Sequence, residues 1–123
     1  MEKIYYNKLC RDKIPEIIRA KGFDCGIRET DHNEYKREIV RKVYEEASGV
    51  HNHDDHDHMI AELADLSITV DALVKAFNIS EKEMKFAITK SLDEKGGYEK
   101  RLYLSWSSDT EYSSNESTPG LDD

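Results

Sequence analysis

The chain has 123 residues, of which 36% are charged and 37% hydrophobic, and its formal net charge is −8 at pH 7. This length allows about one domain with a modest core, so the composition favours a small helical protein that oligomerises over a β-sandwich. Residues 105–123 carry five acids and no Lys or Arg, which leaves only −3 for residues 1–104. Without a dominant basic patch, binding to duplex nucleic acid is not expected.

The sequence also argues against a membrane protein. Glu62, Asp65 and Asp71 interrupt the most apolar stretch, so no segment has the roughly 18 uninterrupted apolar residues that a membrane span needs. The first ten residues lack the order of charged and then apolar residues that marks a signal peptide. The two cysteines match no metal or redox spacing, and free thiols in a chain without a leader predict a cytoplasmic protein.

The N-terminal part predicts a short extended segment and then a short helix. Residues 3–9, "KIYYNKL", are rich in aromatic and β-branched side chains and favour an extended conformation. Residues 11–22 predict a helix with Asp12 as its N-cap, Pro15 in its first turn and Gly22 after its end. We expect its three isoleucines to face inward: Ile14, Ile17 and Ile18.

Three further helices are predicted, over residues 31–48, 59–77 and 80–95. The first shows apolar residues at four-residue spacing, and the last opens with "SEKE", which has the pattern of a capping box. Residues 49–57 are predicted to be a loop, and the glycine pair at 96–97 ends the last helix. Residues 98–104 predict a second extended piece. The fold class is therefore all-α, a four-helix arrangement over residues 1–104, followed by a disordered, acidic, Ser-rich tail over residues 105–123.

Carboxylates lie within the apolar parts of two predicted helices. Helical geometry puts Glu46 about 20° from Ile39, on the apolar stripe, whereas Glu45 points toward water or a neighbouring subunit. In the third helix Asp65 falls on an apolar face and Glu62 at its border. Burying such groups alone is costly. A divalent cation with oxygen ligands, such as Mg2+, offsets this cost; the alternative is ion pairing with Arg37, Arg41 or Lys42.

Four blocks of sequence, in order, resemble the MazG-like, phosphoribosyl-ATP-pyrophosphohydrolase-like family of nucleotide pyrophosphohydrolases. The blocks are "YNKLCRDKIPEII", "EE" at the end of the second predicted helix, "ELADL" in the third, and "EKGGYEKRLYL". The resemblance covers about residues 4–104. It implies an α-helical bundle that assembles as a homodimer or homotetramer. It also implies Mg2+-dependent cleavage, with Mn2+ as a substitute, of a nucleoside triphosphate between its α- and β-phosphates.

The family's metal motif, Glu-Glu-x-x-Glu followed by Glu-x-x-Asp, is incomplete in this chain. Glu45 and Glu46 match the first pair, and Glu62 and Asp65 match the last, but Gly49 stands where the third glutamate is expected. The resemblance assigns Glu46, Glu62 and Asp65 to metal ions, and Glu45 to a second ion or to the attacking water. With Gly49, either the metal site is weaker, or another ligand replaces the glutamate, or catalysis is lost.

Basic residues in the first and last blocks are candidates for binding the substrate's phosphates. Arg offers a planar fork and Lys a point charge for phosphate oxygens. The candidates are Lys8, Arg11, Lys95, Lys100 and Arg101. The loop "HNHDDHDH" at 51–58 either supplies a replacement ligand, through His51 or His53, or is simply a polar loop.

Three classes of function are compatible with the sequence. The first is a metal-dependent pyrophosphohydrolase that converts a nucleoside triphosphate to the monophosphate and pyrophosphate. The second is a catalytically weakened relative that binds or senses a nucleotide without hydrolysis, which the departure at Gly49 keeps open. The third is a helical interaction module without a ligand, which leaves the carboxylates in the apolar helices unexplained.

Overall fold

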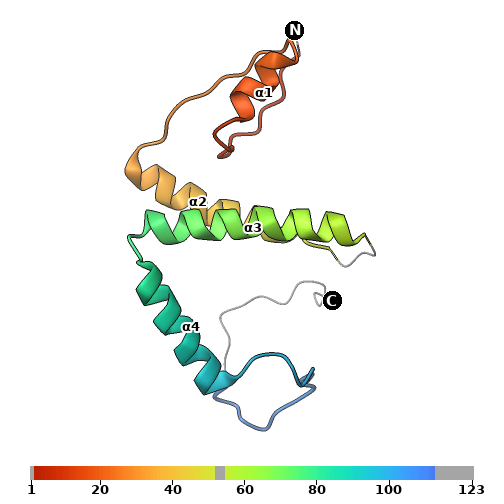
Figure 1. The fold of residues 1–123 in the computed structure, drawn as a ribbon, viewed down its shortest axis with the longest axis vertical. Helices are drawn as coiled ribbons and strands as arrows, with labels where there is room; N and C mark the ends of the chain where they lie inside the picture. The colour runs from red at the N-terminus through yellow and green to blue at the C-terminus, as the bar shows by residue number, and fades with distance from the viewer. Residues whose placement is uncertain (1, 52–54, 113–123) are drawn as a thin grey trace. The chain divides into compact units, whose positions relative to one another are not determined.

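The computed structural model describes residues 2–51 and 55–112. These residues contain four helices: α1 (Ile14–Ala20), α2 (His32–Ser48), α3 (His56–Ala76) and α4 (Glu81–Lys95) (Figure 1). No strand occurs in the described part of the chain, which confirms the all-α class. Residues 3–9 and 98–104, predicted to be extended, therefore form neither a helix nor a strand.

The chain divides into two compact units, residues 1–87 and residues 88–123, with the boundary inside α4. The first unit contains α1, α2 and α3, and so most of the candidate site. The predicted tail belongs to the second unit, and its residues 113–123 lie outside the described part of the chain. Of the predicted His/Asp loop, residues 52–54 also lie outside it.

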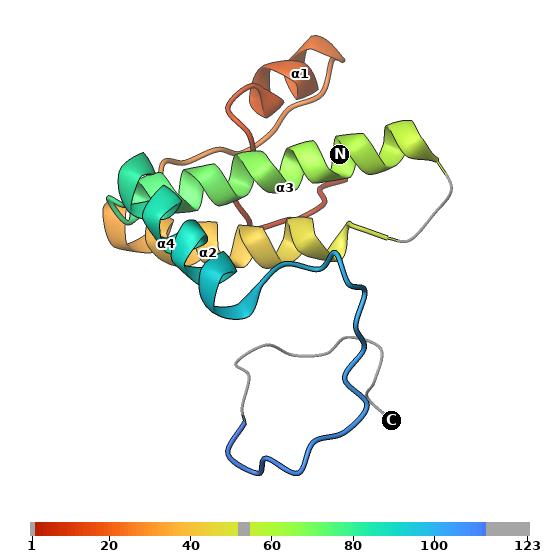
Figure 2. The same ribbon diagram turned by 60° about the horizontal axis from the view of Figure 1, so that its bottom comes forward.

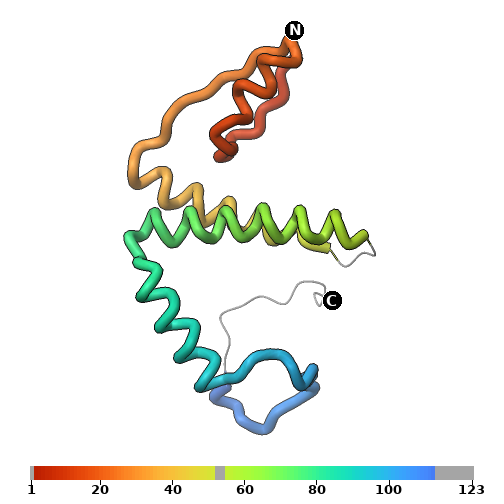
Figure 3. Tube along the Cα trace, in the orientation of Figure 1, coloured from red at the N-terminus to blue at the C-terminus, as the bar shows by residue number. Residues whose placement is uncertain are grey.

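α1 forms where the sequence predicts it, but its cap differs. The residue before the helix is Lys13, whose side chain makes no capping hydrogen bond, so the prediction of Asp12 as N-cap is wrong. Pro15 lies in the first turn, and Gly22 follows the helix with φ +89°, a conformation that glycine adopts without strain. Ile17 is 45% exposed, so the prediction that it faces inward is also wrong. Residues 23–31 then run to α2 without regular structure (Figure 3).

α2 and α3 both begin at an aspartate that caps the helix. Asp31 accepts a hydrogen bond from the Glu34 amide at 2.8 Å, and Asp55 accepts one from the His58 amide at 3.1 Å. Because Asp55 satisfies a free amide of the first turn, α3 starts at His56, inside the segment predicted to be a loop. His56 and His58 are therefore helical residues rather than loop residues.

α2 and α3 pack side by side and run antiparallel (Figure 2), and they are the one pair of helices in contact among the described residues. The contact buries Ile39 of α2 and Thr69 of α3, each 5% exposed. Glu62 lies on the same side of α3 as Thr69, with its side chain 15% exposed, whereas the Asp65 side chain is 54% exposed. The predicted positions of these two acids on α3 are thus reversed, because the side that meets α2 carries Glu62 and Thr69 among half-buried apolar residues such as Leu66 and Leu73.

α4 begins and ends as the sequence predicts. Ser80 and Glu83 form a reciprocal capping box: the Ser80 amide donates to Glu83 Oε2 at 2.7 Å, and the Glu83 amide donates to Ser80 Oγ at 3.0 Å. Gly96 follows the last helical residue with φ +80°. No helix in the described part of the chain is long and apolar enough to cross a membrane. Cys10 and Cys25 are free thiols.

Candidate functional site

The four candidate metal ligands lie at one end of the α2–α3 pair, which we call the carboxylate end. Glu45 and Glu46 belong to the last turn of α2, and Glu62 and Asp65 to the N-terminal half of α3. Because the two helices are antiparallel and joined by a short connection, these segments come to the same end of the pair (Figure 2). The block "EE" of α2 and the block "ELADL" of α3 therefore lie at the same end of the helix pair in the first unit.

Lys42 provides the counter-charge within α2. Its Nζ lies 3.3 Å from Glu45 Oε2 and 3.7 Å from Glu46 Oε1, and its side chain is only 16% exposed. Arg41, by contrast, pairs with Glu38 at 3.6 Å. Of the three bases that the ion-pairing alternative requires, Lys42 is thus the one that neutralises the motif's acids.

The N-terminal segment adds two more cations to the carboxylate end. Lys8 Nζ lies 3.9 Å from Glu45 Oε1, and Arg11 Nη1 lies 3.5 Å from Asp65 Oδ1. Both basic residues come from the block "YNKLCRDKIPEII", and both were predicted to bind phosphate. The structure therefore brings this block to the acids of α2 and α3, although the three are separate in sequence.

Glu62 is contacted by a residue in the first turn of α3 and by the third residue after the end of α2. His58 Nε2 lies 3.0 Å from Glu62 Oε1, and the backbone amide of His51 donates to Glu62 Oε2 at 3.2 Å. Whether His51 or His53 supplies a replacement ligand stays a prediction. The backbone N–H of His51 contacts Glu62, His53 lies outside the described residues, and the imidazole of His58 also lies beside Glu62. The i, i+4 spacing of His58 and Glu62 on one helix is the sequence signal that reveals this pair.

Helical geometry predicts that Glu45 points toward water or a neighbouring subunit. In the structure it lies instead beside the N-terminal segment. Its side chain is 32% exposed and that of Glu46 is 29% exposed, so the two are equally enclosed. Glu45 Oε2 is buried and has no hydrogen-bond partner among the described residues, and its contact with Lys42 lacks hydrogen-bond geometry. The reason is the N-terminal segment, whose Lys8 covers the side of α2 that the isolated helix leaves open.

The carboxylate end has the donor chemistry of a Mg2+ site but not a closed set of ligands. Its acids offer oxygen atoms, which hard divalent cations prefer, and Glu45 Oε2 is a buried oxygen that lacks a hydrogen bond. In the described part of the chain, however, no three acidic, histidine or cysteine side chains are grouped closely enough to hold one ion. The residue types fit Mg2+, and the side chains of Glu45, Glu46 and Asp65 would have to turn away from their basic partners to bind it.

Gly49, the departure from the family motif, is the C-cap of α2. Its backbone has φ −78° and ψ −13°, which every L-amino acid adopts, and its amide donates to Glu46 O at 3.1 Å. A Cβ added at this position would lie 3.3 Å from Glu46 O, a tight contact. The chain's conformation therefore does not require glycine here, and a glutamate would fit with a small adjustment.

The remaining predicted phosphate-binding residues belong to the second unit. Lys95 is the last residue of α4, and Lys100 and Arg101 follow the glycine pair. All three are exposed, so their part in a site stays a prediction. Arg101 has φ +55°, uncommon for a residue other than glycine, and its amide donates to Tyr98 O at 3.0 Å.

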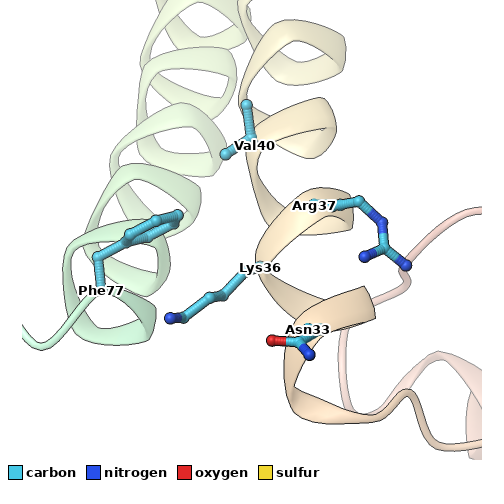
Figure 4. Close-up of a pocket in the computed structure, with 5 residues that line it drawn as sticks. All are labelled: Asn33, Lys36, Arg37, Val40 and Phe77. Atoms are coloured by element: carbon cyan, nitrogen blue, oxygen red, sulfur yellow. The ribbon is translucent and has the colours of Figure 1, made fainter.

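The opposite end of the α2–α3 pair carries a hollow, which we call the Phe77 end. The hollow has a volume of about 580 Å3 and is lined by Asn33, Lys36, Arg37, Val40 and Phe77. Lys36 Nζ lies over the Phe77 ring, 5.2 Å from its centroid, and Val40 turns toward α3 while Arg37 turns away from it (Figure 4). None of the predicted site residues lines this hollow.

One ion pair near the start of α2 shifts the protonation of its members. Arg28 Nη1 and Nη2 donate to the two Glu34 carboxylate oxygens at 2.8 and 2.6 Å. These hydrogen bonds and the adjacent positive charge lower the pKa of Glu34 below its ordinary value and raise the pKa of Arg28 above its own. The Arg28 side chain is exposed and that of Glu34 is half-buried, and the pair lies outside the candidate site.

Comparison with known proteins identifies no similar protein. No protein-family model, no curated protein and no solved structure matches the chain.

Proposed function

We propose that the protein is a metal-dependent nucleoside triphosphate pyrophosphohydrolase of the MazG-like kind, which releases a nucleoside monophosphate and pyrophosphate. One observation carries this proposal. Lys8 and Arg11 of the N-terminal block contact Glu45 and Asp65, which belong to two other blocks of the family pattern. Phosphoanhydride hydrolysis requires this combination of carboxylates and cations in one place, because the phosphate charge must be neutralised while a water is aligned.

Glu46, Glu62 and Asp65 are the residues that would hold Mg2+, for which Mn2+ can substitute. When bound, the ion supplies positive charge for the phosphate oxygens of the substrate. Oxygen-only donors suit this hard cation better than softer transition metals. The ligand set is carried mainly by α3, because α2 lacks the glutamate that Gly49 replaces.

The chain's own cations and Glu45 supply the other contributions. Lys8 and Arg11, exposed by 43% and 55%, can turn from the carboxylates to phosphate oxygens, with Arg11 offering two parallel N–H donors. Glu45 Oε2, which lacks a hydrogen bond, can accept one from the attacking water and so orient it. We assign Lys95, Lys100 and Arg101 to further phosphate contacts on the strength of the family pattern.

The proposal is tested by incubating the full chain with a panel of nucleoside triphosphates in Mg2+ or Mn2+. We expect monophosphate and pyrophosphate as products, and we expect Glu62→Gln to abolish their formation, because this substitution keeps the shape of the side chain and removes its charge. A Lys90→Gln variant is the control, since Lys90 pairs only with Glu94 of α4 among the described residues. Orthophosphate as the product, or turnover unaffected by Glu62→Gln, contradicts the proposal.

The second candidate is a relative that binds a nucleotide without hydrolysing it. It is favoured by Gly49 and by the absence of any three close metal-ligating side chains among the described residues. Titration of an α,β-methylene nucleotide into the protein, beside the hydrolysis assay, distinguishes the two functions. Binding of this analogue with no product from the natural nucleotide supports the second candidate. If the protein neither binds the analogue nor forms product, the remaining function is a helical interaction module.

We also propose that a second copy of the chain completes the helical bundle, as a homodimer or homotetramer. Ile39, 5% exposed, is the one buried apolar side chain among the described residues, a small core for a chain of this length. The side of α3 away from α2 exposes large apolar residues: Ile60 (53%), Leu63 (47%), Ile68 (46%) and Val70 (38%). An identical partner can cover such a face with its own.

The oligomer is tested by light scattering of the purified chain and of Leu63→Lys. We expect a dimer or tetramer for the unmodified chain and a smaller species for the variant, because a charge on this face opposes association. A monomer at all concentrations contradicts the proposal. We further propose a cytoplasmic location, in keeping with nucleotide substrates and with Cys10 and Cys25 as free thiols.

A further inference from the structure

We infer that His58 is a positioning residue that holds the Glu62 carboxylate in the orientation in which it binds the metal ion. This inference rests on the proposed function and deepens it. It concerns a residue that the family pattern does not include and that the sequence places in a loop.

His58 is itself fixed by the start of α3. Its amide donates to the N-cap Asp55 at 3.1 Å, which holds the first turn. The next residue on the same side of the helix, four positions later, is Glu62, and the His58 Nε2 atom lies 3.0 Å from Glu62 Oε1. This contact places the imidazole directly against the carboxylate.

Among the described residues, Glu62 is the candidate ligand whose carboxylate accepts a backbone hydrogen bond. The His51 amide donates to Oε2 at 3.2 Å while His58 contacts Oε1, and the side chain is 15% exposed. Asp65 has an ion pair with Arg11 at 3.5 Å and is 54% exposed. Glu45 has ion pairs with Lys8 and Lys42, and Glu46 has one with Lys42. Glu62 is therefore the most enclosed and the most constrained of the four carboxylates.

A fixed orientation of the Glu62 carboxylate favours metal binding. Each carboxylate oxygen has two lone pairs, so an oxygen that accepts a hydrogen bond can still coordinate an ion. Groups that hydrogen-bond a ligand fix its orientation, and removing one commonly costs 10–100-fold in metal affinity. A carboxylate that is already held in one orientation also loses less side-chain entropy when it binds.

The position of His58 also bears on the missing glutamate of α2. With glycine at position 49, α2 lacks one ligand of the family motif. His51, two residues after Gly49, contacts Glu62 through its backbone amide. The contacts of His51 and His58 thus strengthen the α3 side of the site, where the sequence has kept both motif acids. We expect the site to depend on Glu62 more than on any carboxylate of α2.

The test is the affinity of the full chain for Mn2+ alone, measured by electron paramagnetic resonance without nucleotide. His58→Ala should weaken Mn2+ binding about tenfold or more, and His58→Gln should recover part of it, because its amide N–H can still donate to Glu62. The matched control is His56→Ala, two residues earlier in the same helical turn and exposed. It should bind Mn2+ like the unmodified chain. Melting temperatures without metal show whether each variant folds.

The outcomes separate this inference from the proposed function. If Glu62→Gln loses Mn2+ and His58→Ala binds it normally, His58 has no positioning role while the metal site stands. If His58→Gln is as weak as His58→Ala, the imidazole acts as a ligand rather than a donor, which overturns the positioning role. If the unmodified chain binds no Mn2+, the proposed metal site fails and the inference fails with it.

Discussion

The two ends of the α2–α3 pair differ in charge although the same two helices form both. At the carboxylate end, Glu45 and Glu46 occupy the last turn of α2, which contains no basic residue. At the Phe77 end, the hollow is lined by Lys36 and Arg37 near the start of α2, and no acid lines it. The carboxylate end therefore depends on cations from outside this last turn, which are Lys42 of α2 and Lys8 and Arg11 of the N-terminal segment.

The C-terminal end of α2 opposes the electrostatic preference of an α-helix, whereas its start follows this preference. The macrodipole favours acids at the N-terminus and bases at the C-terminus, each by roughly 0.3–1 kcal/mol. The start of α2 has Asp31 as its N-cap and Glu34 in its first turn, but its last turn has two acids and no base. A sequence that breaks a local rule at one place commonly does so for a function, which agrees with the site proposed at the carboxylate end. The Phe77 end has no comparable cluster of acids among its lining residues.

The largest expected effect is the difference between two variants, each of which removes one charge from one end of the α2–α3 pair. Glu46→Gln should lower the rate of nucleotide hydrolysis about 100-fold, because it removes the charge of a proposed metal ligand while keeping its volume. Lys36→Gln, at the Phe77 end, should leave the rate within about twofold, because its contact is with the Phe77 ring 5.2 Å away. Pyrophosphate release measured at saturating Mg2+ compares the two variants.

A reversed result would break the comparison between the ends. If Lys36→Gln reduced hydrolysis and Glu46→Gln did not, the hollow at the Phe77 end would be the functional site. A decrease in both variants that follows a loss of melting temperature would mean that each end stabilises the pair. We expect both variants to melt close to the unmodified chain.

Restoring the family motif at the carboxylate end should give the next largest effect. Gly49→Glu is expected to raise Mg2+ affinity about tenfold, because Gly49 has φ −78° and the new side chain lies three residues after Glu46, on the same side of α2. Gly49→Gln is the control, with the same size and no charge. Isothermal titration with Mg2+ measures the affinity. An equal gain for both variants would show that the loss of glycine, and not the new ligand, is responsible.

The sequence predicts the local structure of this chain better than its packing. The capping box of Ser80 and Glu83, Pro15 in the first turn of α1 and the glycines after α1 and α4 all follow from local chemistry, and all are confirmed. The start of α3 was missed because a run of histidines and aspartates resembles a loop, although Asp55 is an effective N-cap.

The candidate site shows where sequence reasoning ends. Helical angles place Glu46 beside Ile39, but they describe α2 in isolation, and the N-terminal segment encloses Glu45 equally. The periodicity of α3 predicts two apolar faces, and the side that meets α2 carries the polar residues Thr69 and Glu62 beside Leu66 and Leu73. Which face is used depends on the partner helix, and hydrophobicity alone does not identify it. The contacts of Lys8 and Arg11 with acids 37 and 54 residues later are tertiary, so no local pattern contains them.

A smaller effect is expected from Lys42, which keeps the carboxylate end stable without metal. Lys42→Met should lower the free energy of unfolding by roughly 1–2 kcal/mol, because Glu45 and Glu46 then lose their common cation and repel each other. Added Mg2+ should restore the stability of this variant more than that of the unmodified chain. Arg41→Met is the control, since Arg41 is 64% exposed and pairs with Glu38. Urea unfolding with and without Mg2+ tests the expectation, and equal losses in both variants would contradict it.

The smallest expected effect is a pH dependence near the start of α2, away from the carboxylate end. The Arg28 hydrogen bonds lower the pKa of Glu34 from its ordinary value of 4.5 in the folded chain. The unfolded chain therefore takes up a proton first as the pH falls, so the pair's contribution to stability is present above the ordinary pKa of 4.5 and is lost as the pH falls through the lower pKa of the folded chain. Arg28→Met should lower the melting temperature slightly at pH 7 and by less at pH 3, and the effect is small because solvent screens the exposed guanidinium. Melting curves between pH 3 and pH 7 measure the difference, and Lys21→Met, a matched change at the end of α1, is the control. A difference that grows toward acid pH would mean that Arg28 acts through a partner other than Glu34.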